Sequence, residues 1–267
     1  MAGTTTYTVT ADDGQGGTVS DSFVVTTRAD AALRLVGSNV LFPETDSSLV
    51  TINATNATAT TIRTTPVGFR RLTELQGQVF GIRSGRGGTR AMPAELWSVD
   101  VGSPSESTKI GDLPTSIVSG RGLETHNGVV YAAEGRSLYE VNTTDPSMTT
   151  LLGTVGRISS SDNISGIASL NGVLYVGATQ GGRRNQIWAV DPTNLASPTF
   201  VVNIGTRIIH GIWELVAWNG FLYLWDTNGN LFVRIDVSDN SITLVGTLPE
   251  ATAGSLRGMT AAIVPVN

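Results

Sequence analysis

Histidine acts as an acid–base catalyst and as a metal ligand near neutral pH, and the chain contains two, His126 and His210. His126 directly precedes an Asn-Gly pair, where similar segments of the chain have an apolar residue. We therefore interpret it as a buried structural histidine. Glu124 lies two residues earlier and is expected on the same face of a strand, so the two side chains could supply two metal ligands. His210 is expected in a loop before a strand, where it could line a ligand site.

Signatures of covalent and phosphate chemistry are missing from the sequence. The chain has no cysteine, which excludes disulfides, thiolate metal sites and cysteine nucleophiles. It also has no Gly-x-Ser-x-Gly motif and no phosphate-binding loop that leads into a helix. Asp100, Asp191 and Asp236 each end a repeated strand, where an aspartate caps the following turn. We interpret these aspartates as scaffold, and enzymatic activity as uncertain and less favoured than binding.

A repeated order of short strands and turns must position these residues. One marker is a strand that ends in Val or Ile followed by Asp or Asn. It occurs five times, at 49–53, 96–100, 138–142, 187–191 and 232–236. Before four of these markers, Asn-Gly or Gln-Gly joins two apolar strands, which is a strong signal for a tight hairpin because both turn residues adopt positive φ. A four-stranded unit that recurs about every 45 residues is typical of a propeller blade.

The repeat predicts an all-β fold, a β-propeller of about five four-stranded blades that occupies residues 31–267. The blades are expected approximately at 31–66, 70–114, 120–157, 163–206 and 211–249. Residues 257–264 resemble the first strand of a blade, and we expect them to pair with the amino-terminal blade and close the ring. The alternatives are a truncated sixth blade at this end of the chain and, for the fold as a whole, a generic meander or sandwich.

Propeller topology sorts the connections onto two ends. The loops that enter the first strand and that join strands two and three lie at one end, here called the long-loop face. The Asn-Gly turns and the turns after the third strand lie at the other end, the short-turn face. Most arginines fall on the long-loop face and most acidic residues on the short-turn face. Arg70, Arg121 and Arg257 each begin a first strand, so we expect them to ring the channel mouth and bind carboxylate, sulfate or phosphate groups.

Three further residues of the fifth blade complete the predicted ligand site. They are His210, Trp213 and Glu214. Trp213 belongs to a group of tryptophans that crowds this blade, and sugars stack well on such rings, although core packing is the favoured explanation for the group.

Residues 1–30 lack the blade pattern and form a separate predicted unit. Residues 7–26 read as two alternating strands around a Gly-rich loop, which predicts a β-hairpin. This hairpin resembles the last strands of bacterial cadherin-like repeats, whose Ala-x-Asp motif matches Ala11-Asp12-Asp13. The resemblance implies a weak calcium ligand at Asp13, in a site that lacks the other acidic motifs of that family and the six to eight oxygens that calcium takes. The blades themselves resemble bacterial propellers of the Leu-Tyr-x-Val-Asp type.

Charge and composition limit the partners. A net charge of −5 disfavours nucleic acid, and the absence of a long apolar segment predicts that no helix inserts into a membrane. The leading prediction is a non-catalytic binding or adhesion module of a secreted or cell-surface bacterial protein, exported with neighbouring domains. Its ligand, a polysaccharide or peptide, is expected on the long-loop face near the axial channel, and calcium at the amino-terminal unit or in the channel is the one cofactor considered. The alternative is a propeller-type metal-assisted hydrolase or lyase that acts on a sugar or lactone.

Overall fold

The computed structural model describes residues 3–12, 18–27, 31–39, 47–87, 90–179, 185–205, 212, 214–226, 231–247 and 256–265. The chain forms two compact units, one of Met1–Leu33 with Ile263–Asn267 and one of Arg34–Ala262. Among the described residues the helical elements are short 3-10 turns, among them η1 (Pro104–Glu106) and η2 (Pro146–Met148), and none is a helix that could cross a membrane.

The first unit contains an antiparallel hairpin of β1 (Gly3–Asp12) and β2 (Thr18–Thr27), in which Tyr7 lies opposite Phe23. This agrees with the hairpin expected from the alternating pattern. Asp13, the predicted calcium ligand, lies outside the described residues, and the cadherin-like origin of the hairpin stays a prediction.

The second unit is a β-propeller of five four-stranded antiparallel blades, as the repeat predicts. In each blade the strand next to the axis is called the inner strand. The inner strands are β24 (Leu256–Pro265), β6 (Arg71–Leu75), β12 (Gly122–His126), β16 (Asn163–Leu170) and β20 (Glu214–Trp218). The second strands are β3 (Ala31–Asn39), β7 (Gln78–Arg83), β13 (Val129–Glu134), β17 (Val173–Thr179) and β21 (Phe221–Asp226).

The two remaining strands of each blade lie progressively farther from the axis. The third strands are β4 (Ser47–Asn53), β10 (Glu95–Val99), β14 (Ser137–Val141), β18 (Asn185–Val190) and β22 (Leu231–Asp236). The outer strands are β5 (Thr58–Thr65), β11 (Thr108–Asp112), β15 (Thr150–Thr154), β19 (Thr199–Asn203) and β23 (Ser241–Thr247). Blades 1 to 5 are numbered from the sheet that contains β3. In blade 2, the loop between the second and third strands adds a small ladder of β8 (Arg86–Gly87) and β9 (Arg90–Ala91).

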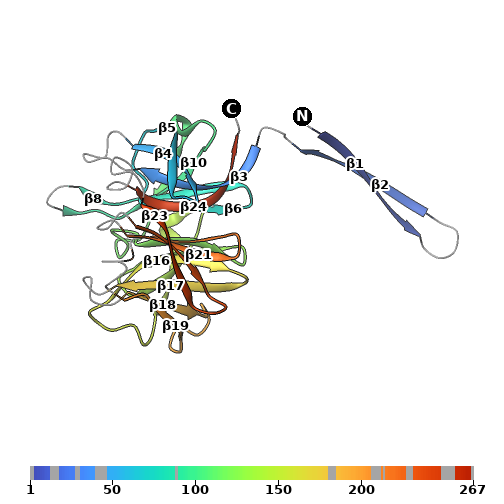
Figure 1. Ribbon diagram of the computed structural model, residues 1–267. Coiled ribbons are helices and arrows are strands. Elements are labelled where there is room, and N and C mark those ends of the chain that lie inside the picture. The colour runs from blue at the N-terminus through green and yellow to red at the C-terminus, as the bar shows by residue number, and fades with distance from the viewer. Residues whose placement is uncertain are drawn as a thin grey trace. The chain divides into compact units, whose positions relative to one another are not determined.

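Blade 1 takes its inner strand from the other end of the sequence. The sheet order is β24-β3-β4-β5, so the red strand β24 lies beside the blue strand β3 in Figure 1. Met259 on β24 is buried in a cluster with Leu35 and Val50 of blade 1 and Trp225 of blade 5. The predicted closure by the carboxyl-terminal strand is therefore confirmed, and the ring closes at five blades.

Tight turns connect each inner strand to the second strand of its blade. The first turn residues Gln76, Asn127, Asn171 and Asn219 have φ between 47° and 53°, and the glycine that follows each of them also has positive φ. This is the conformation of the two-residue hairpin turn that suits the twist of antiparallel strands. The turns fix the pairing register of the inner strands and hence which side chains meet near the axis.

The turns after the third strands are held by Asp or Asn side chains. Asp191 Oδ1 accepts hydrogen bonds from Thr193 N at 2.8 Å and Thr193 Oγ1 at 2.7 Å, and Asp236 makes the same pair of bonds with Ser238. These bonds hold the pKa values of Asp191 and Asp236 below their usual range. The interpretation of the repeated aspartates as scaffold is confirmed for these turns.

Candidate functional site

One arginine lies across the axis near the start of the inner strands. Arg71 Nη1 lies 3.1 Å from Glu214 Oε2, so the ion pair joins blade 2 to blade 5. Arg71 Nε donates to the carbonyl of Arg121 at 2.6 Å, and Nη2 donates to the carbonyl of Ser165 at 3.0 Å, in blades 3 and 4. Nη1 also donates to the carbonyl of Arg70 at 2.5 Å. A single guanidinium thus connects four of the five blades.

This ion pair is almost fully removed from water. Arg71 is 6% exposed and Glu214 is 2% exposed. Burial raises the pKa of Glu214 well above its usual value, while the charge of Arg71 and a hydrogen bond from Leu215 N act in the opposite direction. Burial likewise lowers the pKa of Arg71, but a guanidinium stays protonated in proteins. Its fixed fork of donors suits the carbonyl and carboxylate oxygens that surround it.

The repeat explains how the guanidinium fits. Arg71, Gly122, Gly166 and Glu214 each lie five residues before the first turn residue of their blade, so they occupy one level of the ring. A Cβ atom added to Gly166 would lie 2.6 Å from Leu215 N, because β16 and β20 approach each other closely here. Glycine at this level lets the inner strands converge, and the two non-glycine residues supply opposite charges.

A cavity of about 260 Å³ lies along the axis between this ion pair and the short-turn face, and every inner strand contributes to its wall. The lining residues are Thr73, Glu74, Glu124, Thr125, Ser169, Val216, Ala217 and Thr260. Those nearer to Arg71, such as Thr73 and Val216, are buried, whereas Glu74 and Ala217, one step closer to the turns, are half-buried. The cavity therefore opens toward the short-turn face.

Glu124 is the most perturbed acid of the cavity wall. Its Oε1 atom accepts a hydrogen bond from Ser169 N at 3.1 Å. Burial raises the pKa of the Glu124 carboxyl to about 8, and this one hydrogen bond only partly opposes the effect. Part of its surface remains accessible because it faces the cavity, although protein atoms surround it closely. At neutral pH the cavity wall thus holds a mostly protonated carboxyl group, a property that is common in binding and catalytic sites.

Hydroxyl groups complete the polar part of the wall. Thr73 Oγ1 donates to Thr125 Oγ1 at 3.0 Å.

His126 contacts a residue of this wall. Ser169 Oγ lies 2.9 Å from His126 Nδ1, and Asn127 Nδ2 lies 3.1 Å from His126 Nε2, so both ring nitrogens have partners. His126 is buried, as predicted for a structural histidine, and burial lowers its pKa. In the part of the chain that the structure describes, no group of three His, Cys, Asp or Glu side chains could hold a metal ion.

Of the six residues predicted to bind ligand, Arg70, Arg121 and Glu214 lie close together near the axis. Arg70 and Arg121 enter their inner strands side by side, but what they bring to the axis is their carbonyl oxygens, bound to Arg71. The Arg121 side chain lies 4.0 Å from Glu134, and Glu214 pairs with Arg71. The side chain of Arg257 is not described, and His210 and Trp213 lie outside the described residues. A ligand on the long-loop face stays a prediction, while the axial cavity opens at the opposite end.

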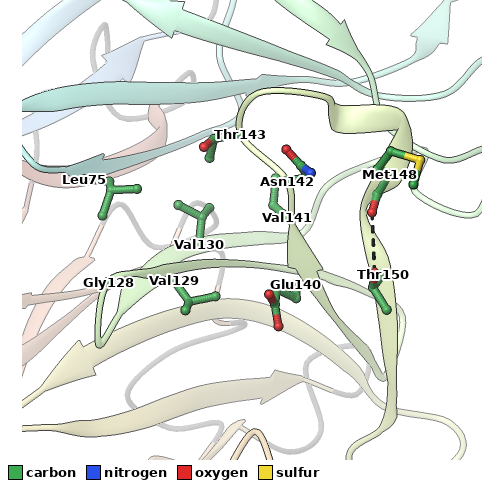
Figure 2. Close-up of a pocket in the computed structure, with 10 residues that line it drawn as sticks. All are labelled: Leu75, Gly128, Val129, Val130, Glu140, Val141, Asn142, Thr143, Met148 and Thr150. Carbon is green, nitrogen blue, oxygen red and sulfur yellow. Dashed lines mark hydrogen bonds between the residues drawn. The ribbon is translucent and has the colours of Figure 1, made fainter.

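A second hollow, of about 320 Å³, lies on the short-turn face where blades 2 and 3 meet (Figure 2). Leu75 of blade 2 and Val130 and Val141 of blade 3 form an apolar part of its wall. Glu140 and Met148, also of blade 3, belong to the wall as well. Figure 2 shows the hydrogen bond between Thr150 Oγ1 and the carbonyl of Met148, 3.4 Å long, at its edge. The residues that line this hollow come from two blades only, whereas all five inner strands contribute residues to the axial cavity.

Sequence reasoning missed Arg71 and gave Glu124 a minor role. Arg71 is one of the arginines that the topology assigns to the long-loop face, and the sequence analysis gives it no separate role. The equivalent positions of blades 2 to 5 are Arg71, Gly122, Gly166 and Glu214, a cation, two glycines and an anion. Opposite charges at equivalent positions of different blades are the signal that could have identified an axial ion pair. Glu124 was examined as a partner of His126, and both do contact Ser169 of the adjacent inner strand.

Comparison with known proteins supports the fold. No family model matches the sequence, and no curated protein matches it. Among solved structures, a chain of the "Crystal structure of Nidogen/Laminin Complex" is similar, with a TM-score of 0.51 and 12% identity, over 97% of this chain and 98% of that chain. At this identity the likeness shows the β-propeller fold alone.

Proposed function

We propose that this propeller is a non-catalytic binding module whose ligand enters the axial cavity from the short-turn face. The observation that carries the proposal is the convergence of all five inner strands on one cavity. Ligand sites are concave and combine a few well-placed polar groups with apolar surface. Thr73, Glu124 and Ser169 supply such polar groups here, and Val216 and Ala217 supply the apolar surface.

The wider setting that we propose is adhesion or recognition by a secreted or cell-surface bacterial protein, with a polysaccharide or peptide partner and neighbouring domains. Two observations support it: the hairpin that resembles cadherin-like repeats, and a similar fold in a chain of a nidogen and laminin complex. Calcium at Asp13 belongs to this setting and rests on the resemblance.

Filling the cavity tests the proposal. Ala217→Phe adds a ring to the cavity wall, and Ala196→Phe adds the same ring to an exposed turn after a third strand, at the same end of the propeller. A panel of small amines, sugars and carboxylic acids is screened by ligand-observed NMR. We expect ligands of the wild-type protein to be lost in Ala217→Phe and kept in Ala196→Phe. Ligands that both variants bind equally well would place the site elsewhere.

The second candidate function is an enzyme, the metal-assisted hydrolase or lyase acting on a sugar or lactone. The specific observation in its favour is the raised pKa of Glu124 in an accessible cavity, because such a carboxyl can donate a proton to a leaving group. A turnover screen with lactones and glycosides, with and without divalent metal ions, distinguishes the candidates. Turnover that Glu124→Gln abolishes would favour the enzyme.

A further inference from the structure

The axial cavity offers acceptors of hydrogen bonds but no free cation among the described residues. Its ionisable groups are Glu74 and Glu124. The nearest described cation is Arg71, whose guanidinium donates to carbonyl groups and pairs with Glu214. A negatively charged ligand group would therefore meet carboxyl groups without a compensating charge, whereas a cationic group would find its counter-charge in the wall.

The turns between the third and outer strands lie on the same face as the cavity mouth but farther from the axis, and they carry the same sign of charge. The described turns of the short-turn face contain no Lys or Arg and six acidic residues: Asp100, Glu106, Asp145, Asp191, Asp236 and Asp239. Of the cations on the adjoining strands, Arg234 stacks on the Phe221 ring and Lys109 pairs with Glu95 and Asp112. A surface lined by one sign of charge raises the local concentration of the opposite charge. This observation is independent of the cavity, because none of these residues lines it, and it also points to a cationic ligand.

The wall of the cavity indicates what kind of cation fits. On β20, Val216 and Ala217 present apolar surface, and on the other inner strands Thr73, Ser169 and Thr260 present hydroxyl groups. An ammonium group has three donors and no acceptor, which suits a carboxylate with hydroxyl oxygens beside it. The apolar surface can pack against the methylene chain that carries the ammonium group, whereas a bare metal ion has no apolar part to contact it.

We propose that the axial cavity binds a primary ammonium group on a short alkyl chain, with Glu124 as its counter-charge. The inference rests on the proposed function of the cavity and names its ligand class. A free polyamine and a lysine side chain of a partner protein carry the same group, and their shared chemistry is what the cavity recognises.

Binding of this kind is coupled to release of a proton. Among the inner-strand side chains that the structure describes, the charged and titratable groups besides Glu124 are Arg71 and Glu74 of β6, Glu214 of β20 and His126 of β12. The charge of Glu124 also raises the pKa of Glu214. The residues that β16 and β24 contribute to the cavity, Ser169 and Thr260, carry no charge. Because burial raises the pKa of Glu124 to about 8, the ligand must remove its proton at neutral pH. Affinity should therefore rise by up to about tenfold per pH unit below about pH 8 and level off above it.

The test uses isothermal titration of the whole chain with diaminopentane and with pentanediol, its neutral counterpart of the same shape. Titrations at about pH 6.5 and about pH 8.5 measure the proton coupling, because the diamine stays fully charged over this range. We expect the diamine to bind, more tightly at the higher pH, and the diol to bind at least tenfold more weakly. A second pair is lysine with an acetyl group on its backbone nitrogen and a methylamide at its carboxyl end, whose side-chain ammonium group is free, and the glutamine analogue of the same compound. This pair decides whether a lysine side chain of a peptide also enters the cavity.

Two carboxyl variants complete the design. Glu124→Gln keeps the size of the side chain and an acceptor for Ser169 N, and should abolish diamine binding. Glu140→Gln removes a carboxyl from β14 outside the cavity, and should leave binding unchanged. Equal affinities for diamine and diol, or unchanged binding in Glu124→Gln, would overturn the ammonium inference. The proposed function would survive that result if Ala217→Phe still abolished binding, and would fail if no ligand of any class bound to the cavity.

Discussion

Arg71 Nη1 and Glu214 Oε2 lie 3.1 Å apart near the axis of the propeller, and they come from the inner strands of blades 2 and 5. The same guanidinium binds carbonyl groups of blades 3 and 4. This contact lies between the long-loop ends of the inner strands and the axial cavity, whose half-buried lining residues Glu74 and Ala217 lie toward the short-turn face. It also fixes the spacing of the inner strands on which the cavity wall depends.

Breaking this buried ion pair should destabilise the propeller strongly. Arg71→Leu leaves the Glu214 carboxylate buried without its partner, which costs about 3–5 kcal/mol of unfolding free energy. The double variant Arg71→Leu, Glu214→Leu removes both charges and should recover a large part of the loss. Urea denaturation of the wild type, both single variants and the double variant measures the coupling between the two side chains.

The partly exposed pair of Arg83 and Glu95, 3.3 Å apart, provides the control. Arg83→Leu should cost less than about 1 kcal/mol, because solvent screens this pair. Equal losses for Arg71→Leu and Arg83→Leu would mean that the axial contact has no special structural role.

Closure of the ring by β24 predicts unequal effects of two methionine substitutions. Met259 on β24 is 1% exposed between blades 1 and 5, whereas Met148 in η2 is 65% exposed. Met259→Ala should lower the unfolding free energy by about 2–5 kcal/mol because it leaves a cavity in the core. Met148→Ala should change it by less than about 0.5 kcal/mol. Chemical denaturation of both variants is the measurement, and a small effect of Met259→Ala would contradict closure through this strand.

Gln76 occupies a turn position where the other described hairpins between an inner and a second strand have Asn127, Asn171 and Asn219. Its φ is 53°, and asparagine tolerates this left-handed conformation better than glutamine does. We expect Gln76→Asn to raise the unfolding free energy by roughly 0.5–1 kcal/mol and the reverse change, Asn127→Gln, to lower it by a similar amount. Thermal unfolding of the two variants should show shifts of opposite sign, and shifts of the same sign would refute the turn argument.

Much of the fold could be predicted because its signals are local. Asn-Gly turns require positive φ at Asn127 and Gly128, and the Val-Asp strand end at Asp191 requires a capped turn, whatever the rest of the chain does. The axial site is different, because its contacts join residues far apart in the sequence. Arg71 donates to Ser165 and pairs with Glu214 only once five blades surround one axis.

Alternation of side chains is a second reason why the site was harder to predict than the fold. Arg70 and Arg71 are adjacent, and neighbouring residues of a strand point to opposite faces. The sequence does not say which of them faces the axis, because both precede the same apolar strand. Glu124 is a comparable case, since its pKa depends on Ser169 of the next blade and on the enclosure that the ring creates.

Glu124 should make the stability of the propeller fall as pH rises. Its pKa is about 8 in the folded chain and near 4.5 in an unfolded chain, so the folded state holds the proton more strongly between these values. The unfolding free energy of the wild type should therefore decrease through this window, by at most about 1.4 kcal/mol per pH unit, and stop decreasing above about pH 8. Glu124→Gln cannot ionise and lacks this decrease. The difference between the variant and the wild type, measured by urea denaturation from about pH 6 to about pH 9, cancels the contributions of the other titrating groups. We expect the unfolding free energy of Glu124→Gln minus that of the wild type to increase as the pH rises. If this difference in unfolding free energy were constant across the range, Glu124 would titrate as an ordinary exposed acid.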